Sequence, residues 1–161
     1  MGQQLIPANE WIKIIVLSGI IGTAVMTLSM YCLTFLTTKV MPVARVLGTM
    51  ITCQTTDDGH LSDSRIAIAV GILAHYAVGI FFAYCYHVLW MFGVGEPGFW
   101  NGLLLGLLSG TFAVIFWFTF VAVHPFPPKI DLKDYIPALF LGHFIFASTA
   151  VVAYIFLIGK I

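Results

Sequence analysis

The stretch Gly71–Tyr86, GILAHYAVGIFFAYCY, is apolar enough to lie within a membrane and yet carries a histidine near its centre. Gly71 lies four residues before His75, and Gly79 lies four residues after it. At about 3.6 residues per turn, these three residues share one face of a helix. The stretch therefore predicts a membrane-spanning helix in which an imidazole lies between two positions without side chains.

A later stretch, Leu139–Tyr154, repeats this plan as LFLGHFIFASTAVVAY. In both stretches an aromatic residue follows the histidine, a small residue lies four positions after it, and a tyrosine lies eleven positions after it. Eleven residues make about three helical turns, so Tyr86 and Tyr154 share the faces of His75 and His143. The repetition raises the question of whether the two histidines form one site.

The composition indicates an integral membrane protein. Of the 161 residues, 60% are hydrophobic and only 9% are charged, and the mean hydropathy is +1.01. Soluble domains carry about 25% charged residues. The net charge is zero and no basic cluster is present, which indicates that the chain does not bind nucleic acid. We expect a single multi-pass domain over residues 1–161, placed in the inner membrane of a cell.

Four apolar runs are long enough to cross a bilayer, which takes about 20 residues of helix. They cover residues 12–36, 66–92, 101–123 and 136–158. Within hydrocarbon, helices of this length satisfy the hydrogen-bonding groups of their own backbone. The sequence therefore predicts an all-α fold, an integral membrane four-helix bundle.

The polar segment 37–65 separates the first two spans. Its first part, KVMPVARVLGTMI, mixes apolar residues with Lys39 and Arg45, so we expect it to lie along the membrane surface. Its second part, TTDDGHLSDSR, has the composition of a solvated turn. We expect Ser62 or Asp63 to cap the helix that follows.

Small residues at helical spacing mark the expected contacts between helices. Gly102, Gly106 and Gly110 form one stripe on the third span, and Gly22 follows Ser18 at the same spacing on the first. Such positions let the backbones of neighbouring membrane helices approach closely.

The chain also resembles a tandem repeat of two helical hairpins. The first and third spans contain the pairs Gly22-Thr23 and Gly110-Thr111, and the second and fourth contain the histidine pattern. A two-helix unit repeated in tandem gives two copies that run in the same direction. His75 and His143 are then expected at matching depth on parallel helices.

The patterns GxxGTAVMTLSMY in the first span and HYAVGIFFAY in the second, together with the glycine-rich third span, carry a resemblance to a known family. The chain resembles the YagU-like group of small uncharacterised inner-membrane proteins. The resemblance extends over most of the chain and implies a four-helix membrane protein. It implies no particular activity, substrate or cofactor.

Three interpretations of His75 and His143 are open. The two histidines can hydrogen-bond across helices as packing residues, since polar side chains in membrane bundles do so. They can also be axial ligands of haem b, held between facing helices, with Gly71 and Gly79 leaving room for the porphyrin. Third, His60 and His124 can join His75 and His143 around zinc, copper or iron. His87, near the far end of its span, is expected to meet the membrane interface.

The sequence favours a non-enzymatic role. No carboxylate lies inside the expected spans, and no serine stands in a nucleophile motif. We expect a subunit or accessory protein that contacts lipid and packs against a second copy or a larger membrane complex. The alternative is an electron carrier with haem b, or another metal, bound to His75 and His143.

The distribution of basic residues predicts the orientation. One side of the expected bundle carries more of them than the other, and cytoplasmic loops are usually the richer in lysine and arginine. Both termini are therefore expected outside the cytoplasm. The richer side carries Lys39, Arg45, Arg65, Lys129 and Lys133, whereas the other carries Lys13 and Lys160.

Overall fold

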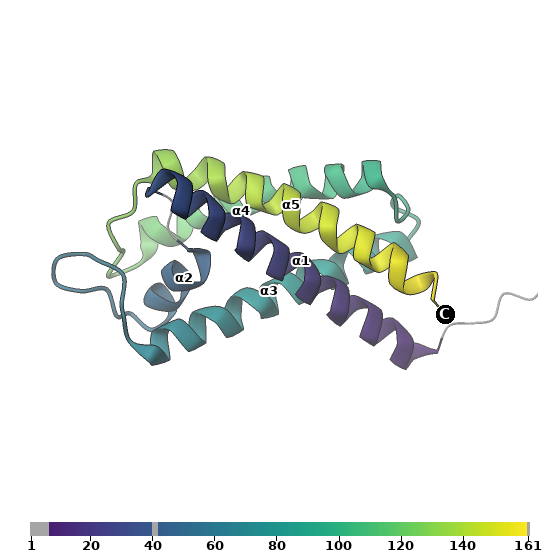
Figure 1. Ribbon diagram of the computed structural model, residues 1–161, viewed down its shortest axis with the longest axis horizontal. Helices are drawn as coiled ribbons and strands as arrows, with labels where there is room; N and C mark the ends of the chain where they lie inside the picture. The colour runs from purple at the N-terminus through teal and green to yellow at the C-terminus, as the bar shows by residue number, and fades with distance from the viewer. Residues whose placement is uncertain (1–6, 40–41, 161) are drawn as a thin grey trace, which may run out of the picture.

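The computed structural model describes residues 7–39 and 42–160 (Figure 1), so the ends of the expected domain 1–161 and two positions of the segment 37–65 lie outside the described residues. Helices account for most of these ranges, and no strand occurs within them. The helices are α1 (Ala8–Thr37), α2 (Val43–Ile51), α3 (Arg65–Met91), α4 (Phe99–Val123) and α5 (Leu132–Ile158).

Four of the described helices, α1, α3, α4 and α5, are long and apolar enough to cross a membrane. They contain 25 to 30 residues each. At 1.5 Å per residue they measure roughly 37–45 Å, more than the ~30 Å of a hydrocarbon core. The excess length is accommodated by tilt and by polar ends. The predicted all-α membrane four-helix bundle is confirmed.

The outer turns of two spans extend beyond the predicted limits because helices tolerate polar residues at their ends. α1 begins at Ala8, before Glu10, and α5 begins at Leu132, before Asp134. At α5 the Asp131 side chain accepts a hydrogen bond from the Lys133 backbone N–H (3.0 Å) and so caps the helix. Span limits set by hydropathy alone leave out such polar residues at the helix ends.

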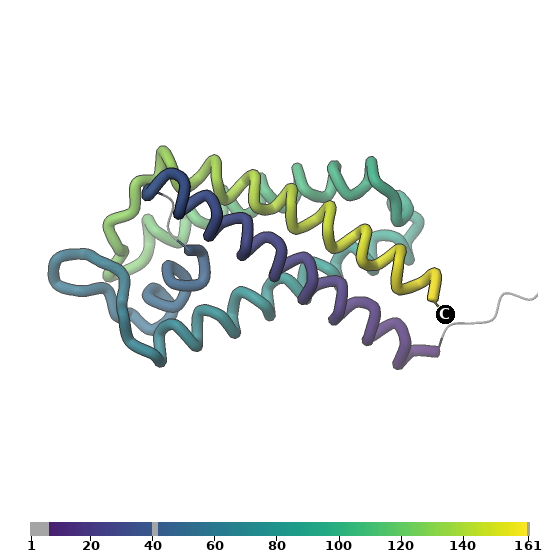
Figure 2. Tube along the Cα trace, in the orientation of Figure 1, coloured from purple at the N-terminus to yellow at the C-terminus, as the bar shows by residue number. Residues whose placement is uncertain are grey.

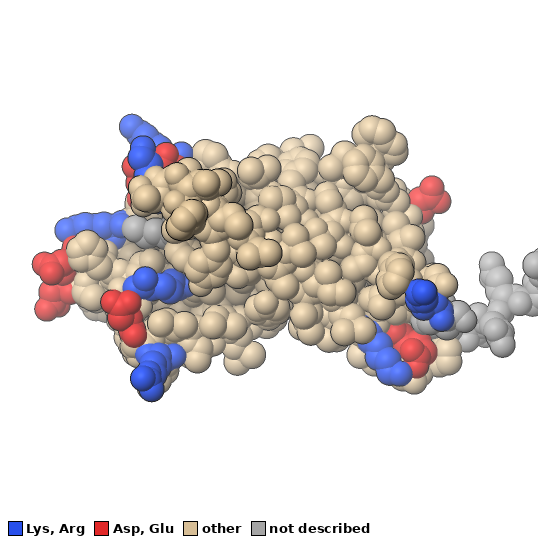
Figure 3. All heavy atoms as spheres, in the orientation of Figure 1, with Lys and Arg blue, Asp and Glu red and all other residues tan. Residues whose placement is uncertain are grey.

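Charged side chains gather at the two ends of the molecule. Figure 3 shows lysine, arginine, aspartate and glutamate at both ends of the long axis, with a broad band between them that carries none on this face. The long helices run along this axis (Figures 1 and 2). This distribution matches a protein whose middle lies in hydrocarbon.

α5 is the central helix of the bundle. It packs extensively against both α1 and α4, and α1 also packs against α3 (Figure 1). α3 and α5 run in one direction, and α1 and α4 run in the other (Figure 2). The pairs α1–α3 and α4–α5 are thus two packed antiparallel hairpins, as the tandem arrangement predicts.

The two hairpins do not meet symmetrically. An exchange of the hairpins would make the contact between α1 and α5 equivalent to one between α4 and α3. α1 and α5 pack along much of their length, whereas the backbones of α3 and α4 rarely approach each other, although only residues 92–98 connect them. Side chains such as Phe82 and Phe112 bridge these two helices. The bundle is therefore open between α3 and α4.

α2 is buried against α3, which differs from the expected position along the membrane surface. Val46 and Met50 of α2 are 0% and 1% exposed. The two helices touch through their backbones, because a Cβ on Gly71 would overlap the Ala44 carbonyl and one on Gly48 would overlap the Ala67 carbonyl. α2 thus fills one end of the bundle.

The turn that leads into α3 is tied to α2, and this displaces the expected cap. The Ser62 N–H donates to Thr49 Oγ1 (3.0 Å), and the Ser62 hydroxyl donates to Gln54 Oε1 (3.2 Å). α3 begins at Arg65 after Ser64, without a side-chain cap. Neither Ser62 nor Asp63 caps the helix, since Ser62 serves the loop and Asp63 pairs with Arg45 of α2.

The predicted packing glycines face α5. A Cβ on Gly106 would lie 3.0 Å from the Phe144 Cα, and one on Gly110 would lie 3.0 Å from the Phe140 ring. Gly102 has more space, with Val151 at 3.4 Å. Gly22 of α1 meets α5 from the other side, at Phe146 and Ala150 (both 3.0 Å).

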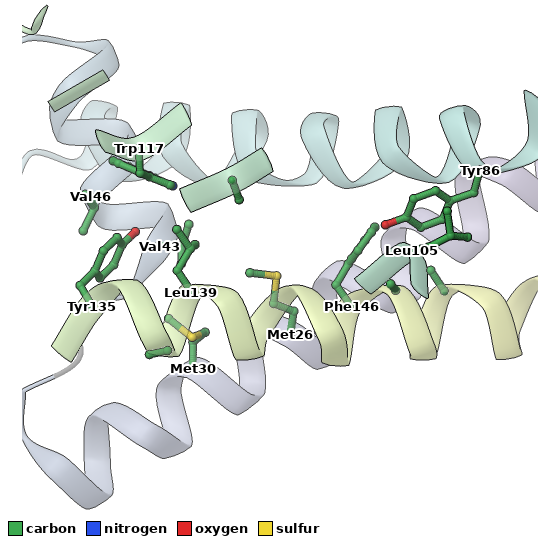
Figure 4. Close-up of a cluster of buried hydrophobic side chains, with 14 of the residues drawn as sticks. Met26, Met30, Val43, Val46, Tyr86, Leu105, Trp117, Tyr135, Leu139 and Phe146 are labelled. Atoms are coloured by element: carbon green, nitrogen blue, oxygen red, sulfur yellow. The ribbon is translucent and has the colours of Figure 1, made fainter. Parts of the chain in front are cut away.

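The main hydrophobic core lies along α5 (Figure 4) and includes Met26, Val46, Trp117, Leu139 and Phe146.

The contact between α2 and α3 gives a testable prediction. Gly71→Ala places a methyl group against the Ala44 carbonyl, so the backbones must separate, and we expect the free energy of unfolding to fall by about 1–3 kcal/mol. Gly102→Ala is the matched control, because its methyl group meets ordinary contacts and gains about 0.5–1 kcal/mol of helix propensity. Thermal unfolding in detergent measures both. Equal melting temperatures for the two variants would contradict this packing.

Candidate functional site

The open side of the bundle contains a cavity of about 230 Å³ in the middle of the molecule. All five described helices contribute to its wall, which is aromatic or aliphatic apart from one threonine and two histidines. The residues that line it are Thr23, Met26, Val43, Leu47, His75, Val78, Gly79, Phe81, Phe82, Phe112, Ala113, Phe116, Trp117, Leu139, His143 and Phe146.

The mouth of the cavity lies between α3 and α4. Val78 and Phe81 of α3, and Phe112 and Phe116 of α4, line the cavity and are 46–60% exposed. They belong to the apolar middle of helices that can span a membrane. In a bilayer this position faces lipid chains, so the cavity opens sideways into hydrocarbon rather than into water.

The structure brings His75 and His143 to the same cavity. Their helices, α3 and α5, run in the same direction, and their backbones rarely approach each other, so side chains such as Phe82 of α3 and His143 of α5 span the distance between them. Each side chain is 8% exposed. The two histidines that the sequence pattern pairs therefore share one site.

His75 is oriented by a threonine that the sequence pattern did not single out. The hydroxyl of Thr27 donates to the Thr23 carbonyl (2.7 Å), which uses its only proton. His75 Nε2 lies 3.2 Å from the same Thr27 oxygen, so Nε2 carries a proton and donates it. The signal was present in the sequence, since Thr23 and Thr27 stand one turn apart on α1.

His143 has the opposite tautomer. Its Nδ1 lies 2.9 Å from the Leu139 carbonyl oxygen of its own helix, which can only accept, so Nδ1 carries the proton. This bond holds the ring against α5. Phe82 meets the ring edge-on, with centroids 5.9 Å apart and planes at 80°.

Each neutral imidazole therefore retains one nitrogen that can accept a hydrogen bond. These atoms are Nδ1 of His75 and Nε2 of His143, and neither has a partner among the described residues. Both histidines line the cavity, whose wall is apolar apart from them and Thr23. Such groups select a ligand by its hydrogen-bond donors.

His87 and Tyr154 form a separate tie near the other end of the bundle. His87 is buried and its Nδ1 lies 2.6 Å from the Tyr154 hydroxyl, which joins α3 to α5. Trp11 of α1 packs on the His87 ring at 4.8 Å. The ring of His87 is therefore held inside the bundle by a partner on the neighbouring helix, and its expected place at the membrane interface stays a prediction.

Neither of the two paired tyrosines lines the cavity with its histidine. Tyr154 bonds to His87, and Tyr86 is buried beside Phe82 and Phe146 in the core. Both lie about three turns from the histidines along their helices, which separates them in depth although they share a face. The histidines and the tyrosines of the repeated pattern therefore lie at two different depths in the bundle.

His60 and His124 do not join the histidine pair. His124 donates from Nε2 to the Met50 carbonyl (2.8 Å) and accepts the Phe126 N–H at Nδ1 (3.1 Å), so both of its nitrogens are engaged. His60 is exposed in the loop before α3. Within the described part of the chain, no three histidine, cysteine or acidic side chains gather closely enough to hold a metal ion.

Gly71 and Gly79 serve helix packing on both sides of His75. α2 occupies the space beside Gly71, and a Cβ on Gly79 would overlap the Thr23 hydroxyl of α1. Gly79 also lines the cavity, whereas Gly71 does not. The room expected for a porphyrin next to Gly71 is thus filled by protein backbone.

The tie between His87 and Tyr154 is testable by a double-mutant cycle. Tyr154→Phe and His87→Phe each remove one partner of a buried bond, so we expect a coupling of about 0.6–2 kcal/mol in the free energy of unfolding. Tyr84→Phe is the matched control, since Tyr84 is 52% exposed on the same helix. Additive effects in the cycle would show that the bond contributes nothing.

Comparisons with known protein families, with curated proteins and with solved structures found no match for this chain.

Proposed function

We propose that this protein is a small, non-enzymatic accessory protein of a membrane that binds an apolar molecule from the bilayer between α3 and α4. The observation that carries the proposal is the cavity of about 230 Å³, which opens sideways between two membrane-spanning helices. An engineered apolar cavity of about 150 Å³ takes up benzene. The cavity is therefore large enough for one substituted ring, with any longer chain left in the bilayer.

The wall of the cavity supports binding rather than catalysis. Among the residues that line it there is no carboxylate, thiol or serine, and Thr23 uses its proton on the Gly19 carbonyl (2.8 Å). The site thus offers shape and two hydrogen-bond acceptors. Covalent catalysis commonly pairs a serine, cysteine or lysine nucleophile with a base, and none of these three residue types stands beside the histidines in the wall.

Haem binding has less support from the same geometry. Haem takes axial histidines, and Nε2 is the nitrogen that reaches farther from the backbone toward a porphyrin. His75 uses Nε2 to bond Thr27, and α2 fills the space beside Gly71. Of the basic residues suggested for the propionates, Arg45 is paired with Asp63.

Association belongs to the same proposal. Phe112, Ile115 and Phe118 of α4 are 51–61% exposed, so the helix beside the mouth presents a large apolar face to lipid. A second copy, or a subunit of a larger membrane complex, that packed there would cover a bound ligand. The resemblance to the YagU-like group remains a prediction and is compatible with such a role.

Localisation and orientation are proposed from charge alone. The end of the bundle formed by α2 and its neighbouring loops carries Lys39, Arg45, Arg65, Lys129 and Lys133. This excess supports an arrangement with that end in the cytoplasm and both termini outside it, as in an inner membrane.

The proposal is tested with a probe that quenches tryptophan fluorescence, 1-bromo-4-nonylbenzene, in lipid nanodiscs. Trp117 lines the cavity and is 4% exposed, so lipid chains do not reach it directly. We expect saturable quenching that Trp117→Phe removes. Ala113→Phe fills the cavity from α4 and is expected to weaken binding of the probe at least tenfold.

The matched control is Ala122→Phe, which makes the same change at an exposed position of α4. It is expected to leave the saturable quenching unchanged. Quenching that does not saturate, or that is equal in Ala113→Phe and the wild type, would refute the proposed function.

A further inference from the structure

We propose that the molecule held between α3 and α4 is a membrane-soluble phenol, a class that includes quinols, with its hydroxyl group donating to one of the two unpartnered imidazole nitrogens, Nδ1 of His75 or Nε2 of His143. This inference rests on the proposed function and names the chemical class of its ligand. The phenol ring lies in the cavity, and its apolar tail leaves through the mouth between the two helices.

The two histidines require a donor rather than an acceptor. Thr27 holds the proton of His75 on Nε2, and the Leu139 carbonyl holds the proton of His143 on Nδ1. The nitrogens left over can only accept while these bonds persist. Both side chains are 8% exposed, so water has little access to satisfy them. A ligand that brings an O–H group satisfies at least one acceptor.

The aromatic wall of the cavity favours a ligand whose hydroxyl group is attached to an aromatic ring. Phe82 lines the cavity and meets Phe112 and Phe146 edge-on, with centroids 6.1 and 6.3 Å apart. Rings prefer such edge-to-face and offset arrangements, so a further ring extends the same packing. The volume of about 230 Å³ accommodates one ring but not a polycyclic ligand with its tail enclosed.

The wall also excludes charged head groups. No lysine, arginine, aspartate or glutamate is among the residues that line the cavity, so a phosphate or ammonium group would be buried without a partner. A quinone, which carries only acceptors, would place its oxygens against acceptors. The hydroxyl form of such a compound is therefore preferred over its oxidised form.

The test uses two ligands that differ in one proton donor, 4-nonylphenol and its methyl ether, 4-nonylanisole. Each competes with 1-bromo-4-nonylbenzene for quenching of Trp117 in nanodiscs at pH 7, where a phenol keeps its proton. One hydrogen bond in a dry site is worth about a factor of ten in affinity. We expect 4-nonylphenol to displace the probe at about one tenth of the concentration that 4-nonylanisole requires.

Two variants test which histidine causes the preference for 4-nonylphenol over 4-nonylanisole. His75→Phe and His143→Phe keep an aromatic side chain and remove the acceptor, and we expect at least one of them to make the two ligands equal. His60→Phe is the matched control, because His60 lies in the exposed loop before α3, and it should retain the tenfold preference. The comparison of two ligands in the wild type does not depend on whether a variant folds.

The outcomes separate the two proposals. If both ligands displace the probe equally from the wild type, or if the preference survives in both histidine variants, the phenol inference is overturned while the proposed function stands. If the probe itself does not bind saturably, the proposed function fails first.

Discussion

Close approach of helix backbones is the contact on which the rest of this structure depends. In hydrocarbon, helices gain little from burying apolar side chains, so packing and polar contacts hold them together. Here glycines provide that packing at three interfaces. Gly71 meets α2, Gly79 meets α1, and Gly106 meets α5, each at distances that a larger residue would prevent.

The cavity is a consequence of where these glycines point. α3 turns its small residues to α1 and α2, and α4 turns its stripe to α5. The faces that α3 and α4 turn to each other carry phenylalanines, among them Phe81 and Phe112, which are too bulky for close approach. The bundle therefore closes on three sides and remains open on the fourth, where two histidines line the gap.

The sequence was sufficient to predict the four spans, their order and the pairing of the two histidines. Length and hydropathy determine the spans, and the repeated glycine–histidine pattern placed His75 and His143 on parallel helices. The packing role of α4 also followed from spacing alone, because Gly102, Gly106 and Gly110 occupy one stripe.

The remaining features depend on contacts between distant segments, which no local pattern contains. α2 looked amphipathic, yet Gly48 and Gly71, far apart in sequence, let it enter the bundle. His87 looked interfacial, and its partner, Tyr154, belongs to the last helix. The asymmetry between the two hairpins arises from which face each glycine stripe occupies, and the cavity follows from it.

The two histidines that line the cavity are neutral and have different tautomers, which leaves Nδ1 of His75 and Nε2 of His143 without a proton and without a partner among the described residues. Solid-state ¹⁵N NMR of histidine-labelled protein in bilayers tests it most directly, because protonated and unprotonated ring nitrogens have well-separated shifts. Variants at His75 and His143 assign the signals. We predict two neutral rings, with the proton on Nε2 in His75 and on Nδ1 in His143. The same tautomer at both positions, or a doubly protonated ring at either, would contradict it.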